Sequence, residues 1–223
     1  MACTQVARML NRRLELGIGW WSLALTLLSP VALAATLQAQ LVDAGGRPLA
    51  DAVLTLQGPQ GAPASPVPAV MDQVQKQFAP AVLAVRTGTE VSFPNSDDIR
   101  HQVYSFSPAK RFELRLYKGT PSSPVRFDKP GVVVLGCNIH DWMAAHVLVV
   151  DTPWFAKTGA DGVARIDGVP PGAYRLRVWH PRQKAAAADR DVSLGAAARR
   201  IEYTLDLTPR VIVPKPPLDA GGY

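Results

Sequence analysis

Short runs of β-branched or alternating apolar residues recur between residues 82 and 150, and turn formers separate them. Such runs include Val82-Leu83-Ala84-Val85, Val103-Tyr104-Ser105-Phe106 and Val147 to Val150, with Gly88, Pro94-Asn95, Pro108 and Pro130 in between. This pattern predicts strands joined by tight turns. We therefore expect an all-β fold of the sandwich or barrel type. Only residues 71–78 and the alanine-rich patches near residues 185–198 favour a helix.

Two further strand-like segments flank this region. Residues 37–56 contain two alternating strands around a Gly-Gly turn, and residues 158–179 contain Gly-Val-Pro-Pro-Gly-Ala-Tyr-Arg-Leu-Arg-Val-Trp. These segments resemble the opening and middle of the carboxypeptidase regulatory-like (transthyretin-like) β-sandwich, where they normally follow one another closely.

About a hundred residues separate the two flanking segments here. Chain ends of compact domains often lie close together, so one domain can be inserted into a loop of another. We expect residues 36–57 and 153–208 to form an Ig-like host domain that contains or adjoins an inserted domain, residues 69–152. Residues 58–68 have a linker composition and residues 209–223 form a Pro/Gly-rich tail. A single enlarged sandwich is the alternative.

The first 34 residues have the composition of a secretory signal peptide. Residues 1–13 carry three arginines and no acid, residues 16–35 carry no charge, and Ala32 and Ala34 form an Ala-x-Ala cleavage pattern. An uncleaved membrane anchor is the alternative, and both place the remainder outside the cytoplasm. The expected location is periplasmic, with contact to the membrane only if the segment stays uncleaved. Arg12-Arg13 also allows twin-arginine export.

Charge and cysteine usage narrow the classes of function. The formal net charge of +6 is spread along the chain without a basic run, so nucleic-acid binding is not expected. Of the two cysteines, Cys3 lies in the predicted leader, so Cys137 becomes the only thiol of the exported chain. No internal disulfide is possible. A single Cys in an oxidising compartment indicates an intermolecular bridge, a reactive thiol or a metal ligand.

Residues 136–143 read Gly-Cys-Asn-Ile-His-Asp-Trp-Met, which places Cys137, His140 and Met143 at three-residue intervals. Thiolate, imidazole and thioether are the ligands of copper sites that transfer electrons, and such sites add a second imidazole. His101 is the best candidate for it, because it stands at a junction of loop and strand. His146 falls within a predicted strand and His180 within the host segment, so both are assigned to structure.

The region from about Phe78 to Asp151 resembles a cupredoxin, most closely the amicyanin and plastocyanin branch with its short Cys-x-x-His-x-x-Met loop. Asn95 through His101-Gln102-Val103 also matches the Asn-x-x-x-x-x-His-x-Val arrangement of amicyanin. The resemblance implies a Greek-key β-sandwich and one blue-type copper bound by His101, Cys137, His140 and Met143. With the host domain, the chain is similar to exported proteins labelled methylamine utilization proteins.

The resemblance also implies that Asn95 hydrogen-bonds behind the ligands. Two departures stand out: Asn138-Ile139 and Asp141-Trp142 replace the prolines of the family's ligand loop, and Gln102 replaces an Asn. Trp142 is expected either to form part of a docking face or to pack over the metal. Asp97 and Asp98 are expected to cap a turn.

The resulting hypothesis is a periplasmic blue-copper protein that carries single electrons between redox partners. The partner protein is expected to dock near His140, with Trp142, Ala144 and Ala145 in the contact. Alternatives are a periplasmic copper chaperone or sequestration protein, and an Ig-like binding module with an accessory copper domain. We expect no enzyme and no small-molecule substrate, because four protein ligands leave no open coordination position. A nucleophilic Cys would also need a His and an orienting partner, and the sequence suggests no such partner.

Overall fold

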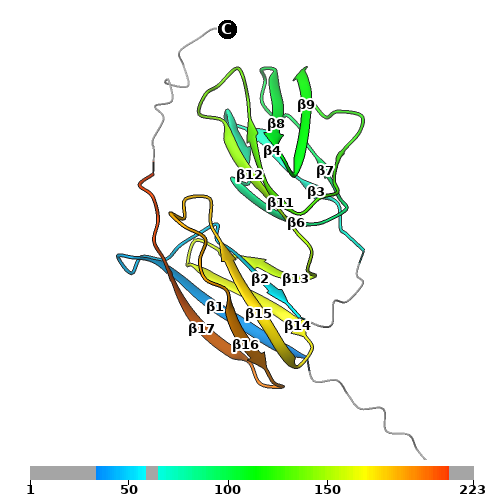
Figure 1. Ribbon diagram of the computed structural model, residues 1–223. Helices are drawn as coiled ribbons and strands as arrows, with labels where there is room; N and C mark the ends of the chain where they lie inside the picture. Colours follow the sequence, from blue (N-terminus) through cyan, green and yellow to red (C-terminus); the bar gives the residue numbers. More distant parts are fainter. Residues whose placement is uncertain (1–33, 59–64, 211–223) are drawn as a thin grey trace, which may run out of the picture. The chain divides into compact units, whose positions relative to one another are not determined.

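The computed structural model describes residues 34–58 and 65–210, and within these ranges it contains strands and no helix (Figure 1). The prediction of an all-β fold is confirmed. The predicted helix at residues 71–78 is wrong, because this stretch forms the hairpin of β4 (Asp72–Val74) and β5 (Gln77–Ala79). The patches near residues 185–198 contain a strand, β16 (Arg190–Leu194). Within residues 34–58 and 65–210, no helix is long and apolar enough to cross a membrane.

One group of strands comes from both ends of the described chain. A three-stranded sheet has the order β14-β1-β17 and a four-stranded sheet the order β13-β2-β15-β16. Their bounds are β1 Ala35–Asp43, β2 Val53–Gln57, β13 Trp154–Lys157, β14 Val163–Val169, β15 Gly172–Trp179 and β17 Arg199–Leu205. Alternation explains β1, because Ala35, Leu37, Ala39 and Leu41 are buried while the residues between them are partly exposed. These side chains belong to one apolar core with Leu54, Ile166 and Leu176.

The second group comes from the middle of the chain. A five-stranded sheet has the order β6-β12-β11-β8-β9, a three-stranded sheet has the order β10-β7-β3, and the β4–β5 hairpin pairs with itself. Their bounds are β3 Ala69–Val70, β6 Val82–Arg86, β7 Thr89–Ser92, β8 His101–Ser107, β9 Lys110–Tyr117, β10 Val125–Phe127, β11 Gly131–Gly136 and β12 Ala144–Val150. Phe93, Phe112 and Phe127 meet in the core of this group, with ring centroids 5.6 to 6.4 Å apart.

All pairings among the described strands join members of the same group. Residues 35–57 pair with strands of residues 154–205, and the strands between them pair among themselves. The insertion of one domain into another stays a prediction. The domain boundaries and the Ig-like character of the host group stay proposals. The predicted signal peptide lies outside the described residues, except for Ala34, as do most of the predicted linker and tail.

Candidate metal centre

One strand and one loop carry the predicted ligands. His101 is the first residue of β8, and Cys137, His140 and Met143 lie on the loop between β11 and β12. Antiparallel pairing of Gly136 with Ala144 closes this loop at its base. Inside the loop, the Met143 backbone N–H donates to the His140 carbonyl at 2.9 Å. The loop therefore projects its three side chains from a short, fixed path of backbone.

The structure brings His101, Cys137 and His140 together. Each offers one ligand atom, and these atoms all lie within 4.8 Å of one another. The His101 Nδ1 atom is 4.0 Å from the Cys137 Sγ atom, and the two imidazole centroids are 5.0 Å apart. The three residues are buried, with 0%, 4% and 5% exposure. Met143 is buried in the same apolar cluster as Cys137.

His140 has a nitrogen without a partner. Its Nδ1 atom is buried, and no hydrogen-bonding group of the described residues reaches it. Leaving a buried polar group unsatisfied costs about 1–3 kcal/mol, so native proteins rarely contain one without a reason. A metal ion that binds the nitrogen lone pair would give this atom the partner that it lacks. Together with a thiol and a second imidazole, the free nitrogen makes the donor set fit copper.

Electrostatics prepare the thiol for a cation. Burial raises the pKa of Cys137, but its contact with His101 and hydrogen bonds with the backbone of Gln102, Ile139 and His140 outweigh it, so this pKa is lowered from its usual value. For His101, burial lowers the pKa, and the contacts with Cys137 and Asp97 raise it by more. Burial and the neighbouring His101 and Lys76 lower the pKa of His140. The thiol is thus biased toward the thiolate that binds metals.

Asn95, predicted to act behind the ligands, shapes the loop that leads to His101. Its Nδ2 atom donates to the carbonyl oxygens of Ile99 and Tyr117, each at 2.9 Å. Its Oδ1 atom accepts from the Asp97 backbone N–H at 3.1 Å. Asn95 is buried, so these bonds replace water and hold the loop backbone. It supports His101 through the loop.

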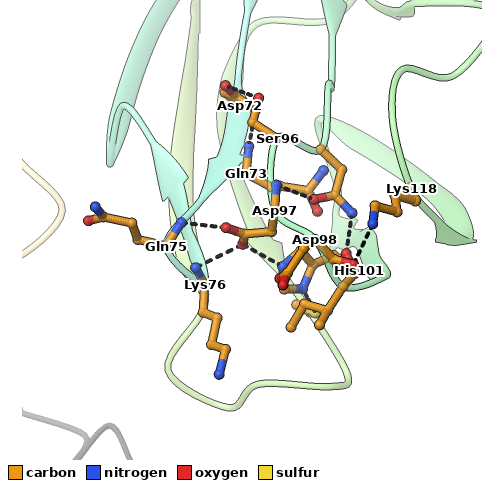
Figure 2. A network of polar contacts seen from close by, with 12 residues as sticks. Asp72, Gln73, Gln75, Lys76, Ser96, Asp97, Asp98, His101 and Lys118 are labelled. Carbon is orange, nitrogen blue, oxygen red and sulfur yellow. Dashed lines mark hydrogen bonds and ion pairs between the residues drawn. The ribbon is translucent and has the colours of Figure 1, made fainter. Parts of the chain in front are cut away.

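Asp97 is a site residue that the sequence pattern assigned only to a turn. Its Oδ2 atom lies 2.7 Å from the Nε2 atom of His101 (Figure 2), whereas Cys137 approaches the other ring nitrogen, Nδ1. The spacing of four residues between Asp97 and His101 was the available signal. It carries little weight in a loop, where four residues do not fix a geometry. The carboxylate does not cap its own loop as expected: its two oxygens accept the backbone N–H groups of Gln75 and Lys76, which belong to another turn.

Trp142 lies against His140. The two ring centroids are 4.9 Å apart with planes at 49°, and the indole Nε1 donates to the Lys76 carbonyl at 3.0 Å. Trp142 is half-buried at the edge of the core cluster that includes Cys137 and Met143. This position matches packing over the ligands, and its exposed part remains available to a docking partner.

One residue of the partner contact expected near His140 is not at the surface. Asn138, Ile139, Asp141 and Ala144 are exposed, whereas Ala145 is only 1% exposed. The prediction that Ala145 touches a partner is therefore wrong: as the second residue of β12, it points into the core. His146 and His180 are absent from the ligand group of the described residues.

Comparisons with known proteins give partial likenesses. No family model matches the chain, and no curated protein matches it. Among solved structures, a Cu-containing nitrite reductase from Thermus scotoductus is 26% identical over 42% of this chain and 25% of its own, with a TM-score of 0.36. A purple cupredoxin from Nitrosopumilus maritimus is 21% identical over 37% of this chain and 99% of its own, with a TM-score of 0.33. A mutant of amicyanin in its reduced Cu(I) form is 18% identical over 44% and 98%, with a TM-score of 0.34. The chain thus spans about a quarter of the nitrite reductase.

Proposed function

We propose that the chain is an exported blue-copper protein that carries single electrons between redox partners. One observation carries the proposal: His101, Cys137 and His140 hold their ligand atoms within 4.8 Å of one another in a buried site. Each of these residue types suits copper in both oxidation states. The unpartnered Nδ1 atom of His140 supports the same reading.

The chain's residues divide the work of such a site. Cys137 would supply a thiolate, His101 and His140 would supply neutral imidazoles, and Met143 would supply a weakly bound thioether. Copper held by them would supply one-electron exchange between Cu(I) and Cu(II). Four protein ligands would fill the coordination sphere, which supports a carrier and would leave no position for a substrate.

The scaffold supports fast exchange because it restricts ligand movement. His101 is held by pairing of β8 with β9, where it faces Tyr117, and the ligand loop is closed by the Gly136–Ala144 pair. The surrounding apolar cluster of Phe93, Val103 and Leu135 excludes water. A site that does not rearrange keeps one geometry for both oxidation states.

The wider setting follows from the sequence. The leader-like residues 1–34 support export to the periplasm. Residues 69–152 would form the cupredoxin domain within a host of residues 36–57 and 153–208, and the strand pairings support this division. A redox partner would dock near His140, where Ile139 and Asp141 are exposed and Trp142 is half-buried.

The test is the visible absorption of the purified protein after addition of Cu(II). We expect an intense thiolate-to-copper charge-transfer band at one copper per chain, and its complete loss in Cys137→Ser. His146→Gln is the matched control, since His146 is a half-buried histidine of β12 that lies outside the ligand group. A colourless copper complex, or colour that survives Cys137→Ser, contradicts the proposal.

A further inference from the structure

The turn of the β4–β5 hairpin has an unfavourable backbone. Val74 pairs with Gln77, which leaves Gln75 and Lys76 as a two-residue turn. Both have φ of 54°, in the left-handed region. Such turns favour Asn and Gly, and an L-residue with a Cβ atom costs roughly 1–2 kcal/mol there. Strain of this kind persists only where the surroundings hold it in place.

Asp97 is what holds this turn. Its Oδ1 atom accepts the Gln75 backbone N–H at 2.6 Å, and its Oδ2 atom accepts the Lys76 backbone N–H at 2.8 Å (Figure 2). Two successive backbone N–H groups in a turn form a concavity that binds an anion. The Asp97 carboxylate occupies it and is thereby fixed in position. Its side chain is 12% exposed.

The fixed carboxylate determines the state of His101. The Asp97 Oδ2 atom also lies 2.7 Å from the His101 Nε2 atom. A carboxylate only accepts hydrogen bonds, so a neutral His101 must carry its proton on Nε2. The lone pair then remains on Nδ1, which faces the Cys137 Sγ atom at 4.0 Å. A nitrogen with a free lone pair is the form that binds a metal.

The same turn reaches the second histidine. The Lys76 carbonyl accepts the Trp142 indole N–H at 3.0 Å, and the Trp142 ring packs on His140. The turn therefore contacts Asp97, the partner of His101, through two N–H groups. It contacts Trp142, the neighbour of His140, through the Lys76 carbonyl. Residues that are far apart in sequence meet at a single turn.

We propose that Asp97 is a positioning residue and that Asp97, the Gln75–Lys76 turn and Trp142 form one clamp that orients both histidines of the centre. Asp97 fixes the tautomer and ring orientation of His101, and the Lys76 carbonyl fixes Trp142 against His140. The consequence for copper rests on the function proposed above. The clamp itself is a property of the copper-free protein.

The first test uses the copper-free protein, with ¹H–¹⁵N NMR of the histidine side chains at alkaline pH. We expect His101 to carry a slowly exchanging proton on Nε2. In Asp97→Asn the amide has a single oxygen and a nitrogen that donates; where this nitrogen replaces Oδ2, the Lys76 and His101 N–H groups both lose their acceptor, and we expect His101 to populate the Nδ1–H tautomer. Asp98→Asn is the matched control, because Asp98 is exposed and carries the same charge one residue away. An Nδ1–H tautomer in the wild type, or an unchanged His101 in Asp97→Asn, overturns the proposal.

The second test measures Cu(II) affinity by competition with a chelator, and the reduction potential by voltammetry. We expect Asp97→Asn to weaken Cu(II) binding about 10- to 100-fold, which is typical of losing a partner behind a ligand. We also expect a higher potential, since a lost negative charge disfavours Cu(II) more than Cu(I). Asp98→Asn should change the affinity by less than about twofold, because an exposed charge is screened. Equal effects of the two variants contradict a positioning role.

Trp142→Phe provides the test of a single unit. It keeps an aromatic ring beside His140 and removes only the N–H that reaches Lys76. If the turn couples the two supports, the losses of Cu(II) affinity in Asp97→Asn and Trp142→Phe are not additive in the double variant. Losses that add to within about twofold show two independent supports and overturn the clamp. A wild type that binds no copper contradicts the proposed function, while the NMR experiment still decides the clamp.

Discussion

Two buried histidines, one in each group of strands, have opposite surroundings. His180 follows β15 in the group built from the chain ends; its Nδ1 atom accepts the Arg182 backbone N–H at 3.1 Å, and it hydrogen-bonds to the Ala50 backbone. His140 belongs to the middle group, and its Nδ1 atom has no partner. Their exposures are nearly equal, 4% and 5%. Burial therefore does not distinguish a structural histidine from a candidate ligand, whereas hydrogen-bond satisfaction does.

The contrast extends to other buried polar side chains. Within residues 34–58 and 65–210, the buried side-chain atoms without a partner are His140 Nδ1 and Gln73 Oε1, both in the middle group. In the other group, the buried Thr158 hydroxyl donates to the Leu49 carbonyl at 2.7 Å and accepts from the Ala52 N–H at 3.0 Å. Hydrogen-bonded polar side chains of this kind are typical of a structural scaffold. In the middle group, the unpartnered His140 nitrogen stays free to bind a metal.

Replacing each histidine with glutamine should separate the two roles, metal ligand for His140 and structural residue for His180, most strongly. His140→Gln removes a ligand, so Cu(II) affinity should fall by more than about 100-fold, beyond the effect of losing a supporting residue. The copper-free protein should keep its stability to within about 1 kcal/mol, because a deficient group is removed. Chelator competition and urea unfolding measure the two effects.

His180→Gln should give the reverse pattern. Disturbing its hydrogen bonds costs about 1–3 kcal/mol of unfolding free energy. Copper affinity should stay within about twofold of the wild type, since His180 lies outside the ligand group of the described residues. A large loss of copper in this variant would remove the distinction between the two histidines.

The pH dependence of stability sharpens the same contrast. Burial, with Arg182 nearby, lowers the pKa of His180 from its ordinary value of 6.5 to about 4. Between pH 6.5 and about 4, His180 therefore binds a proton in the unfolded chain and stays neutral in the folded chain. Stability is complete above this window and falls as the pH drops through it, by up to about 3 kcal/mol.

Urea unfolding of the copper-free protein at several pH values, with and without His180→Gln, isolates this contribution. The variant should be less sensitive to pH between about 6.5 and 4. Identical slopes for the two proteins would show that His180 is not held neutral by the fold.

Two buried methionines offer the smallest and most selective comparison. Met71 and Met143 are 0% and 2% exposed and belong to one core cluster, but only Met143 follows His140 on the ligand loop. Either change to Leu conserves volume and should cost less than about 1.5 kcal/mol of unfolding free energy. Met143→Leu alone should raise the reduction potential and shift the visible band, because the axial ligand tunes the site. Equal potentials in the two variants would exclude Met143 as a ligand.

Local sequence patterns predicted the candidate ligands better than the residues that hold these ligands in place. The all-β fold follows from short strands between turn formers, and the candidate ligands from the spacing of Cys137, His140 and Met143 and the position of His101. The β4–β5 hairpin was missed because Met71, Val74 and Phe78 fall at helical spacing. Its turn has Gln75 and Lys76 in place of Asn-Gly, so no turn signal marks it.

The clamp was missed for a different reason. Asp97 meets Gln75 and Lys76 across more than twenty residues of sequence, and Trp142 meets Lys76 across 66. Such contacts depend on how the loops fold over one another. Ala145 shows the same limit: alternation along β12 turns it inward, and the sequence does not state the register. Ligand spacing is local, while the arrangement that orients ligands is not.

Under the proposed function, the centre exchanges single electrons without releasing its metal. Cyclic voltammetry of the copper-loaded protein, followed by measurement of copper still bound after repeated reduction, tests it most directly. We expect a reversible one-electron wave and one copper per chain at the end, because the ligands are buried and held by paired backbone. An irreversible wave, or loss of copper to an acceptor on reduction, would contradict it.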